Sequence, residues 1–244
     1  MQALHEHVAP DGFRLRGVSP TRVDSFSDVV FGFALTLIVV SQAVPHTYDE
    51  LRTVLLAFPA FSVCFLLFVL IWLSHYRFFR RYGLHDLPTL WINFALLFTV
   101  LFYVYPLKFL FAVAVGYTPA GVFTNPYQPR EMMIVYGAGF AAINLLFAGL
   151  YANAWRQRLH LRLNPVEVTI TNLGFWNYVV TASIGLLCCL LARLLPLDQA
   201  GSAGYGFFVL FGWGRAQSLI ARHYLRIARG HLAPEDHHAV GVHF

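Results

Sequence analysis

The sequence predicts an all-α membrane protein with six transmembrane helices, and three observations support this fold class. The 244 residues are 58% hydrophobic, only 12% are charged, and the mean hydropathy is +0.59. Because a soluble domain carries about 25% charged residues, the low charge indicates lipid as the surrounding solvent. A membrane-crossing helix needs roughly 20 mostly apolar residues. Six such runs occur, approximately at 22–43, 52–75, 88–114, 131–155, 170–194 and 203–224.

The runs define a domain organisation and an orientation. A tail over 1–21 precedes a six-helix domain over 22–224, and a second tail follows over 225–244. Twelve Arg residues flank the runs on one side of the membrane, whereas three Arg and one Lys lie on the other. Because positive charge marks the cytoplasmic side, we expect a multi-pass protein of the cell (plasma) membrane with both termini in the cytoplasm.

The excess of basic over acidic residues in the chain is explained by this topology. The net charge is +5 and the pI about 9.3, but the arginines are spread over four segments without a recognition motif. We therefore expect no nucleic-acid partner and a modest attraction to anionic lipid headgroups. Cys64, Cys188 and Cys189 lie inside the predicted helices and are expected to pack as small apolar side chains. We expect no disulfide framework, metal or other cofactor.

The first run is two-sided when it is placed on a helix at 100° per residue. Asp24 and Asp28 fall on the side opposite to an uninterrupted apolar stripe. Because lipid does not favour carboxylates, we expect the acidic side to meet protein. The stripe is then free to face lipid, another subunit or a central axis. It consists of Phe26, Val30, Phe33, Leu37 and Val40.

The other runs carry polar residues at similar depths on the cytoplasmic side. We expect these residues to form a polar belt in the core of the six-helix unit, paired so that they fix which helices are neighbours. Proton coupling is the alternative, because charges within a membrane often mark function. The belt residues are Asp28, Trp72, His75, Asp86, Asn93, Asn177 and Arg215.

A motif in the first run resembles the signature of a known family. Arg22, Phe26, Ser27 and Asp28, followed by Thr36-Leu37, are similar to the R-x-x-x-F-S-D…T-L signature of the transmembrane protein 175 family of potassium channels. The likeness continues through Trp72-x-x-His75-x-x-Phe78, Asp86, Asn93 and Pro106. One six-helix repeat per chain is similar to the bacterial branch of that family, which assembles as tetramers.

The resemblance implies a homotetrameric channel that passes potassium down its gradient, with the first helix of each subunit lining the pore. The signature residues would pack inside the subunit against the second and third helices. Phe33, Leu37 and Val40 would be the pore-lining layers, and Thr36 would support the constriction from behind. The narrowest layer of the family is typically isoleucine, so a ring of Phe33 would make a bulkier hydrophobic constriction that narrows or shuts the pore.

Two other functions stay open from the residues. A proton-coupled transporter could use Asp28, His75 and Arg215, although most of the helices lack the Gly and Pro interruptions that discontinuous transporter helices often show. A non-conducting paralogue is the other alternative, because of the bulk of Phe33. An enzyme is not expected, since the chain has no H-E-x-x-H motif, Ser/Lys pair or carboxylate cluster, and no nucleophile with a matched base.

Overall fold

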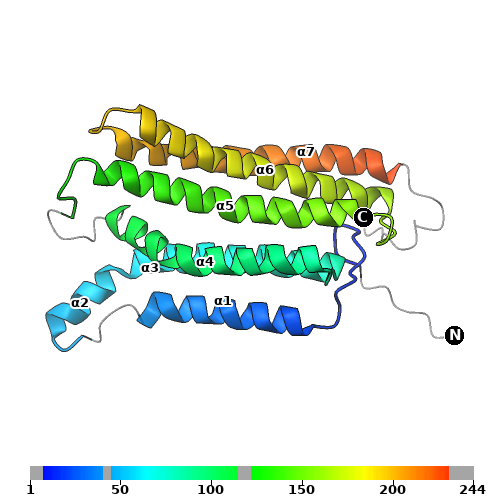
Figure 1. Ribbon diagram of the computed structural model, residues 1–244, viewed down its shortest axis with the longest axis horizontal. Helices are drawn as coiled ribbons and strands as arrows, with labels where there is room; N and C mark the ends of the chain where they lie inside the picture. The colour runs from blue at the N-terminus through cyan, green and yellow to red at the C-terminus, as the bar shows by residue number, and fades with distance from the viewer. Residues whose placement is uncertain (1–7, 41–44, 115–121, 231–244) are drawn as a thin grey trace.

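The protein is an elongated bundle of long helices that run side by side (Figure 1). The computed structural model describes residues 8–40, 45–114 and 122–230. In these ranges the structure is helical, and the only β feature is an isolated bridge between Val8 and Arg14. The elements are α1 (Arg22–Val40), α2 (Tyr48–Leu56), α3 (Phe58–Tyr82), α4 (Leu87–Ala114), α5 (Gln128–Arg156), α6 (Pro165–Leu194), the 3-10 helix η1 (Ala200–Phe208) and α7 (Val209–Arg229).

Four of these helices are long and apolar enough to cross a membrane. Among the described residues they are Phe58–Tyr82, Leu87–Val113, Gln128–Arg156 and Pro165–Leu194. They correspond to the second, third, fourth and fifth predicted runs. The first and last predicted runs form α1 and α7, which are not among the four. The all-helical membrane class is therefore confirmed, and the number of spans observed by this criterion is four.

Two predicted runs are divided, and local chemistry explains each division. The run predicted at 52–75 is split into α2 and α3, which begins at Phe58. Pro59 occupies the first turn of α3 and has no N–H to continue the hydrogen bonding of α2. The run predicted at 203–224 starts as η1, whose sequence AGSAGYGFF contains three glycines that favour an α-helix poorly. It becomes α-helical only from Val209.

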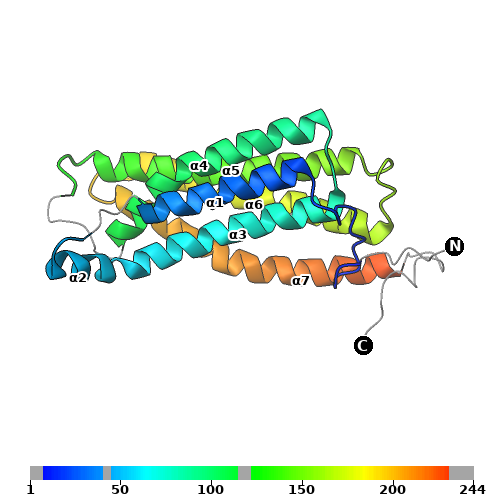
Figure 2. The same ribbon diagram turned by 90° about the horizontal axis from the view of Figure 1, so that it is seen from below.

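The helices pack in an order that places α1 and α7 on opposite sides of the bundle. α1 contacts α3 and α4, and α4 contacts α5. α5 packs along α6, and α6 in turn contacts η1 and α7. Figure 1 shows α1 and α7 at opposite edges, and Figure 2 shows α1 alongside α3 and α4. The start of α1 and the ends of α3, α5 and α7 lie at the same end of the molecule, here called the N-terminal end (Figure 1).

The described part of the predicted N-terminal tail is packed against the N-terminal end of the bundle. Phe13 is buried and meets the edge of the Tyr82 ring. Main-chain N–H groups of Arg16 and Gly17 donate to carbonyl oxygens at the end of α3. Gly17 lies so close to the Phe79 carbonyl that a Cβ atom there would collide with it. Residues 8–17 thus form part of the folded unit, and residues 231–244 of the predicted C-terminal tail lie outside the described residues.

Candidate functional site

α1 is held to the rest of the chain by a narrow row of residues. Ser27, Phe31 and Ala34 are buried, and their spacing of four and three residues places them on one helix face. Small side chains at two of the three positions let α1 approach α3 and α4. Phe31 fills the remaining space, with its ring edge toward Phe68 and His75. This is the face of α1 that is buried against α3 and α4.

A buried hydrogen-bond chain joins the row to the two neighbouring helices. The Asn93 amide nitrogen on α4 donates to the Ser27 hydroxyl at 3.0 Å, and that hydroxyl donates to the Val23 carbonyl at 2.8 Å. The Asn93 carbonyl oxygen lies 2.8 Å from His75 Nε2 on α3. Because an amide oxygen only accepts, Nε2 must carry the proton. Ser27, Asn93 and His75 therefore tie α1, α4 and α3 together with every partner satisfied.

The acidic residues of α1 lie beside this chain. The Trp72 indole N–H donates to the Asp28 carboxylate at 2.9 Å, and Asp28 is exposed to the outside of the subunit. Asp24 accepts from the main chain and hydroxyl of Thr21, and the Thr21 hydroxyl accepts from the Asp24 N–H, which makes a capping box at the start of α1. The carboxylates of Asp24 and Asp28 thus lie at the edge of the surface through which α1 contacts α3 and α4. Arg22 is exposed in the first turn.

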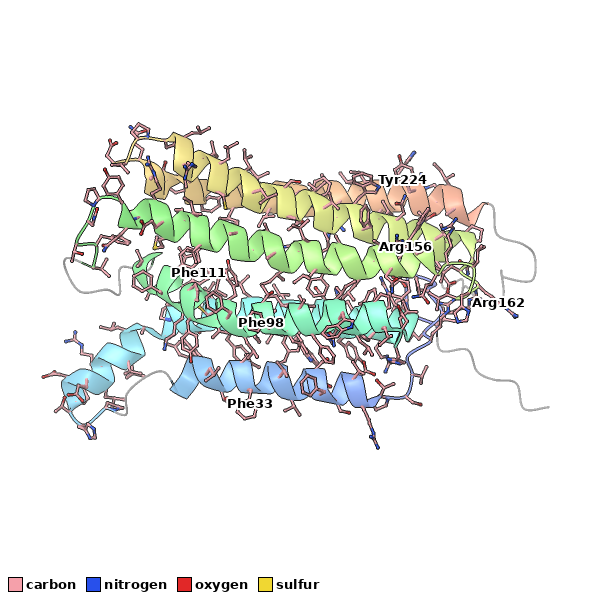
Figure 3. All side chains as sticks on the ribbon, in the orientation of Figure 1. Phe33, Phe98, Phe111, Arg156, Arg162 and Tyr224 are labelled. Carbon is pink, nitrogen blue, oxygen red and sulfur yellow. The ribbon has the colours of Figure 1, made fainter. Side chains whose placement is uncertain are left out.

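The opposite face of α1 is apolar and uncovered. Phe33 is 67% exposed, and Val29 and Phe26 are more than half exposed. Figure 3 shows Phe33 on the side of α1 that points away from the bundle. Leu37 is partly buried, and the exposed Thr36 donates to the Phe33 carbonyl at 2.7 Å. The side chain of Val40 lies outside the described part of the structure.

A row of aromatic side chains on α4 continues this apolar surface. The ring edge of Phe94 meets Phe26 of α1 at a centroid distance of 6.0 Å. The spacing of three and four residues along α4 places the row on one face, and Phe98 is 73% exposed (Figure 3). The exposed members of the row are Trp91, Phe94, Phe98, Phe102, Tyr105 and Phe109. A patch this large indicates contact with lipid or another protein chain.

Asp86 belongs to a separate network that joins α4 to α5. Its carboxylate accepts from the Thr89 hydroxyl at 2.7 Å and from the Asn153 amide at 2.9 Å. Burial opposes ionisation of this group, but hydrogen bonds from Gln157, Thr89 and Asn153 lower its pKa below the ordinary value. Asp86 precedes the first turn of α4 and accepts from the Thr89 N–H, so it also caps that helix.

The structure therefore divides the expected polar belt. Arg215 is exposed on α7, and Asn177 of α6 accepts a hydrogen bond from Trp213. Within the part of the chain that the structure describes, no hydrogen bond or ion pair joins Arg215 to Asp28 or His75. The geometry assembles Ser27, His75 and Asn93, places Asp28 with Trp72 beside them, and leaves Arg215 on the opposite side of the bundle.

An ionic cluster at the N-terminal end was not predicted from the sequence. Glu167 is fully buried, and its carboxylate binds the guanidinium groups of Arg14 and Arg16 at 3.1 and 2.8 Å. It also completes a capping box with Asn164 at the start of α6. The pattern Asn164-Pro165-x-Glu167 is a recognisable helix start, but nothing in the sequence pairs it with arginines 150 residues earlier.

Comparison with known proteins decides the family. A family model described as the endosomal/lysosomal potassium channel TMEM175 matches residues 22–103, which include α1, α3 and most of α4. A protein of Marivirga tractuosa named "Potassium channel" is 32% identical over 233 residues, which cover 88% of this chain and 94% of the relative. This chain belongs to the TMEM175 family.

Further TMEM175 relatives agree with this assignment. A crystal structure of a variant of the potassium channel MtTMEM175, in complex with a nanobody–MBP fusion protein, superposes with a TM-score of 0.75 at 31% identity. The match covers 86% of this chain and 95% of that one. A potassium channel of Chamaesiphon minutus is 30% identical over 141 residues, or 54% of this chain and 64% of the relative. The resemblance based on the signature is thus confirmed, and the family is one of channels, not enzymes.

Proposed function

We propose that this protein is a homotetrameric potassium channel of the cell membrane, with six spans per subunit and α1 lining the pore. The observation that carries the proposal is the two-sided packing of α1. One face is fixed inside the subunit by Ser27, Asn93 and His75, while the other presents Phe33 outward. Four copies arranged with this outward face on a common axis would enclose a path through the membrane. The relatives named as potassium channels supply the expected ion.

The gate in this proposal is a hydrophobic constriction. Phe33 would form the narrowest ring, followed along the helix by Leu37 and Val40. Apolar rings of this kind block ions when water leaves the constriction, and they open when the side chains rotate or move apart. Thr36 bonds to the carbonyl of Phe33 in its own helix and would stabilise the backbone behind the ring. Potassium is then the permeant ion, and no bound cofactor is required.

The orientation in this proposal places the N-terminal end of the bundle in the cytoplasm. Arg77, Arg80 and Arg81 lie in the last two turns of α3, and Arg156 ends α5 at the same end of the molecule (Figure 3). Positive charge of this kind is retained in the cytoplasm. α1 and α7 would complete the six spans because each lies alongside longer apolar helices over part of the bundle (Figure 1).

Potassium flux from liposomes tests the gate. We expect Phe33→Ala and Phe33→Asn to raise flux about tenfold or more, because a smaller or polar ring keeps water in the constriction. Phe208→Ala is the matched control, since Phe208 is 64% exposed on η1, on the side of the bundle away from α1. Equal flux from the wild type, both Phe33 variants and the control would contradict the gate. Counting subunits per particle by electron microscopy tests the tetramer.

A non-conducting paralogue is the second candidate, and the observation that favours it is the size of Phe33. Four phenylalanine rings could fill the axis in every state of the channel. In that case wild-type liposomes would show no flux, while Phe33→Ala would restore it. A transporter is less well supported, because Arg215 lies on α7 and is remote from the His75 and Asp28 contacts.

A further inference from the structure

A cavity away from α1 lies between α6 and α7, toward the N-terminal end of the bundle. Its volume is about 430 Å³, and its walls come from the end of α5, the first half of α6 and the part of α7 from Trp213 to Tyr224. Three of the five Trp residues of the chain line it, namely Trp155, Trp176 and Trp213. Tyr224 also lines it, and Figure 3 shows this residue near the same end as Arg156. The wall offers flat aromatic surface and no carboxylate.

Hydrogen-bond donors remain in this wall. The Trp213 indole N–H donates to the carbonyl oxygen of the Asn177 side chain at 2.9 Å, which fixes the orientation of that amide. The Asn177 amide nitrogen is left as a donor, and among the described residues no acceptor is paired with it. Gln217, one turn further along α7 from Trp213, adds a second amide to the cavity. The cavity therefore combines apolar walls with a few fixed polar groups, as ligand sites do.

Positive charge lies beside the cavity. The Arg158 guanidinium lies 4.0 Å from the centroid of the ring of Trp155, which is one of the lining residues. The connection between α5 and α6 and the whole of α7 contain basic residues and no acidic ones. The next acidic residue after Arg158 is Glu167, whose charge is neutralised by Arg14 and Arg16. An anion bound next to Trp155 would therefore meet the positive charge of Arg158.

We propose that this cavity binds an anionic phospholipid, with the phosphate at Arg158 and the glycerol region against the tryptophans. The acyl chains would continue along the apolar outer surface of α6 and α7, where Leu173 and Ile220 line the groove. A lipid fits better than a soluble phosphate because the walls are aromatic and aliphatic and α6 is a membrane-crossing helix. Tryptophan and arginine are favoured at this depth of a bilayer. The site needs only insertion in a membrane and is independent of whether α1 lines a pore.

Quenching of tryptophan fluorescence by brominated lipid tests the site, since three of the five tryptophans line it. The full-length protein is reconstituted in phosphatidylcholine vesicles, and brominated phosphatidylglycerol or brominated phosphatidylcholine replaces part of the lipid. We expect phosphatidylglycerol to reach half-maximal quenching at a mole fraction about fivefold lower than phosphatidylcholine. Arg158→Gln should remove most of this preference. Ile220→Phe, which fills the groove at a partly exposed position, should reduce the quenching itself.

Arg80→Gln is the matched control, because Arg80 stacks over Tyr76 at 5.6 Å at the same end of the bundle but outside the cavity. This variant should keep the fivefold preference. Parallel quenching curves for the two lipids would overturn the proposal, as would an equal loss in Arg80→Gln and Arg158→Gln. Soluble glycerol phosphate is added in a third arm and should leave the quenching unchanged. Displacement of the lipid by this compound would show a site for a soluble phosphate and would also overturn the proposal.

Discussion

The two halves of the subunit are built differently. In the half made by α5, α6 and α7, α5 packs closely along α6, and 50% of the most apolar stretch of α5 is buried, against 28% for α6. In the half made by α1, α3 and α4, only 22% of the corresponding stretch of α3 is buried, and aromatic side chains on α1 and α4 face outward. The first half therefore centres on α5, whose most apolar stretch is the most deeply buried of the four. The second half holds α1 by a few contacts and leaves its large apolar face for lipid or further subunits.

The largest effect is expected where charge is buried at the N-terminal end. Glu167→Gln leaves Arg14 and Arg16 partly buried without their anion, so we expect a loss of about 3 kcal/mol in the free energy of unfolding. Denaturant or thermal unfolding in detergent measures this loss. Glu131→Gln is the control, because Glu131 is exposed in the first turn of α5 and should change stability by less than about 0.5 kcal/mol. Similar losses in both variants would show that the cluster contributes no special stability.

The second-largest effect is expected from a substitution that disturbs the close packing of α5 on α6. A Cβ atom at Gly185 would lie 2.8 Å from the Gly137 carbonyl oxygen and 3.1 Å from the Ala141 nitrogen. These are backbone atoms that cannot move aside, so Gly185→Ala should cost about 2 kcal/mol. Gly149→Ala on α5 is the control, since its Cβ would meet only Ile92 at 3.7 Å. Because alanine favours a helix, this control should keep or raise the unfolding temperature. An equal drop for both would refute the close-packing argument.

The third effect tests the attachment of α1. Asn93→Leu leaves the Ser27 hydroxyl without its donor and His75 without its acceptor in a buried place, which should cost about 2 kcal/mol. Asn144→Leu removes a buried amide whose bond, among the described residues, is to the Phe140 carbonyl within its own helix, and it should cost less than about 1 kcal/mol. Unfolding in detergent compares the two variants. If Asn144→Leu proves the more damaging, the interhelical chain is not what holds α1.

The smallest effect concerns Asp86 and depends on pH. Its pKa is lowered in the folded state by its hydrogen bonds, so the carboxylate adds stability above its unfolded pKa of about 3.9. That contribution, on the order of 0.5–1 kcal/mol, is lost as the pH falls through the lower folded value. Thermal unfolding of the wild type and Asp86→Asn should therefore differ at pH 6, and the difference should shrink as the pH falls below the unfolded pKa of about 3.9. A difference that stays constant over this range would exclude the carboxylate charge as the cause.

Much of the fold follows from residues that can be recognised in the sequence. Long apolar runs predict α3 to α6 because a membrane-crossing helix must satisfy its backbone within itself. The helical wheel placed Phe33 on an outward face, and it is largely exposed. The signature predicted the contact of Ser27 with the second and third helices only through the family resemblance. Physical reasoning alone could not distinguish Ser27, which is buried, from its exposed neighbour Asp28.

The remaining features depend on contacts between distant parts of the chain. The wheel gives a direction for each residue of α1, but it does not show which direction faces α3 and α4. The buried row of Ser27, Phe31 and Ala34 lies between the acidic side and the apolar stripe, so Asp28 falls at the margin. The predicted depths of the residues in the membrane suggested that Arg215 lies near Asp28. Helix order in space, which the sequence does not contain, places them on opposite sides (Figure 1).

The pairing of Arg14 and Arg16 with Glu167 has a consequence for the order in which the protein folds during its synthesis. The two cations leave the ribosome first, yet their anion is synthesised about 150 residues later. At 5–20 residues per second this interval is roughly 8–30 s, during which α1, α3, α4 and α5 are synthesised. Residues 8–17 cannot make this contact before then, so the N-terminal end of the bundle is held together by these ion pairs only after about two thirds of the chain has been synthesised.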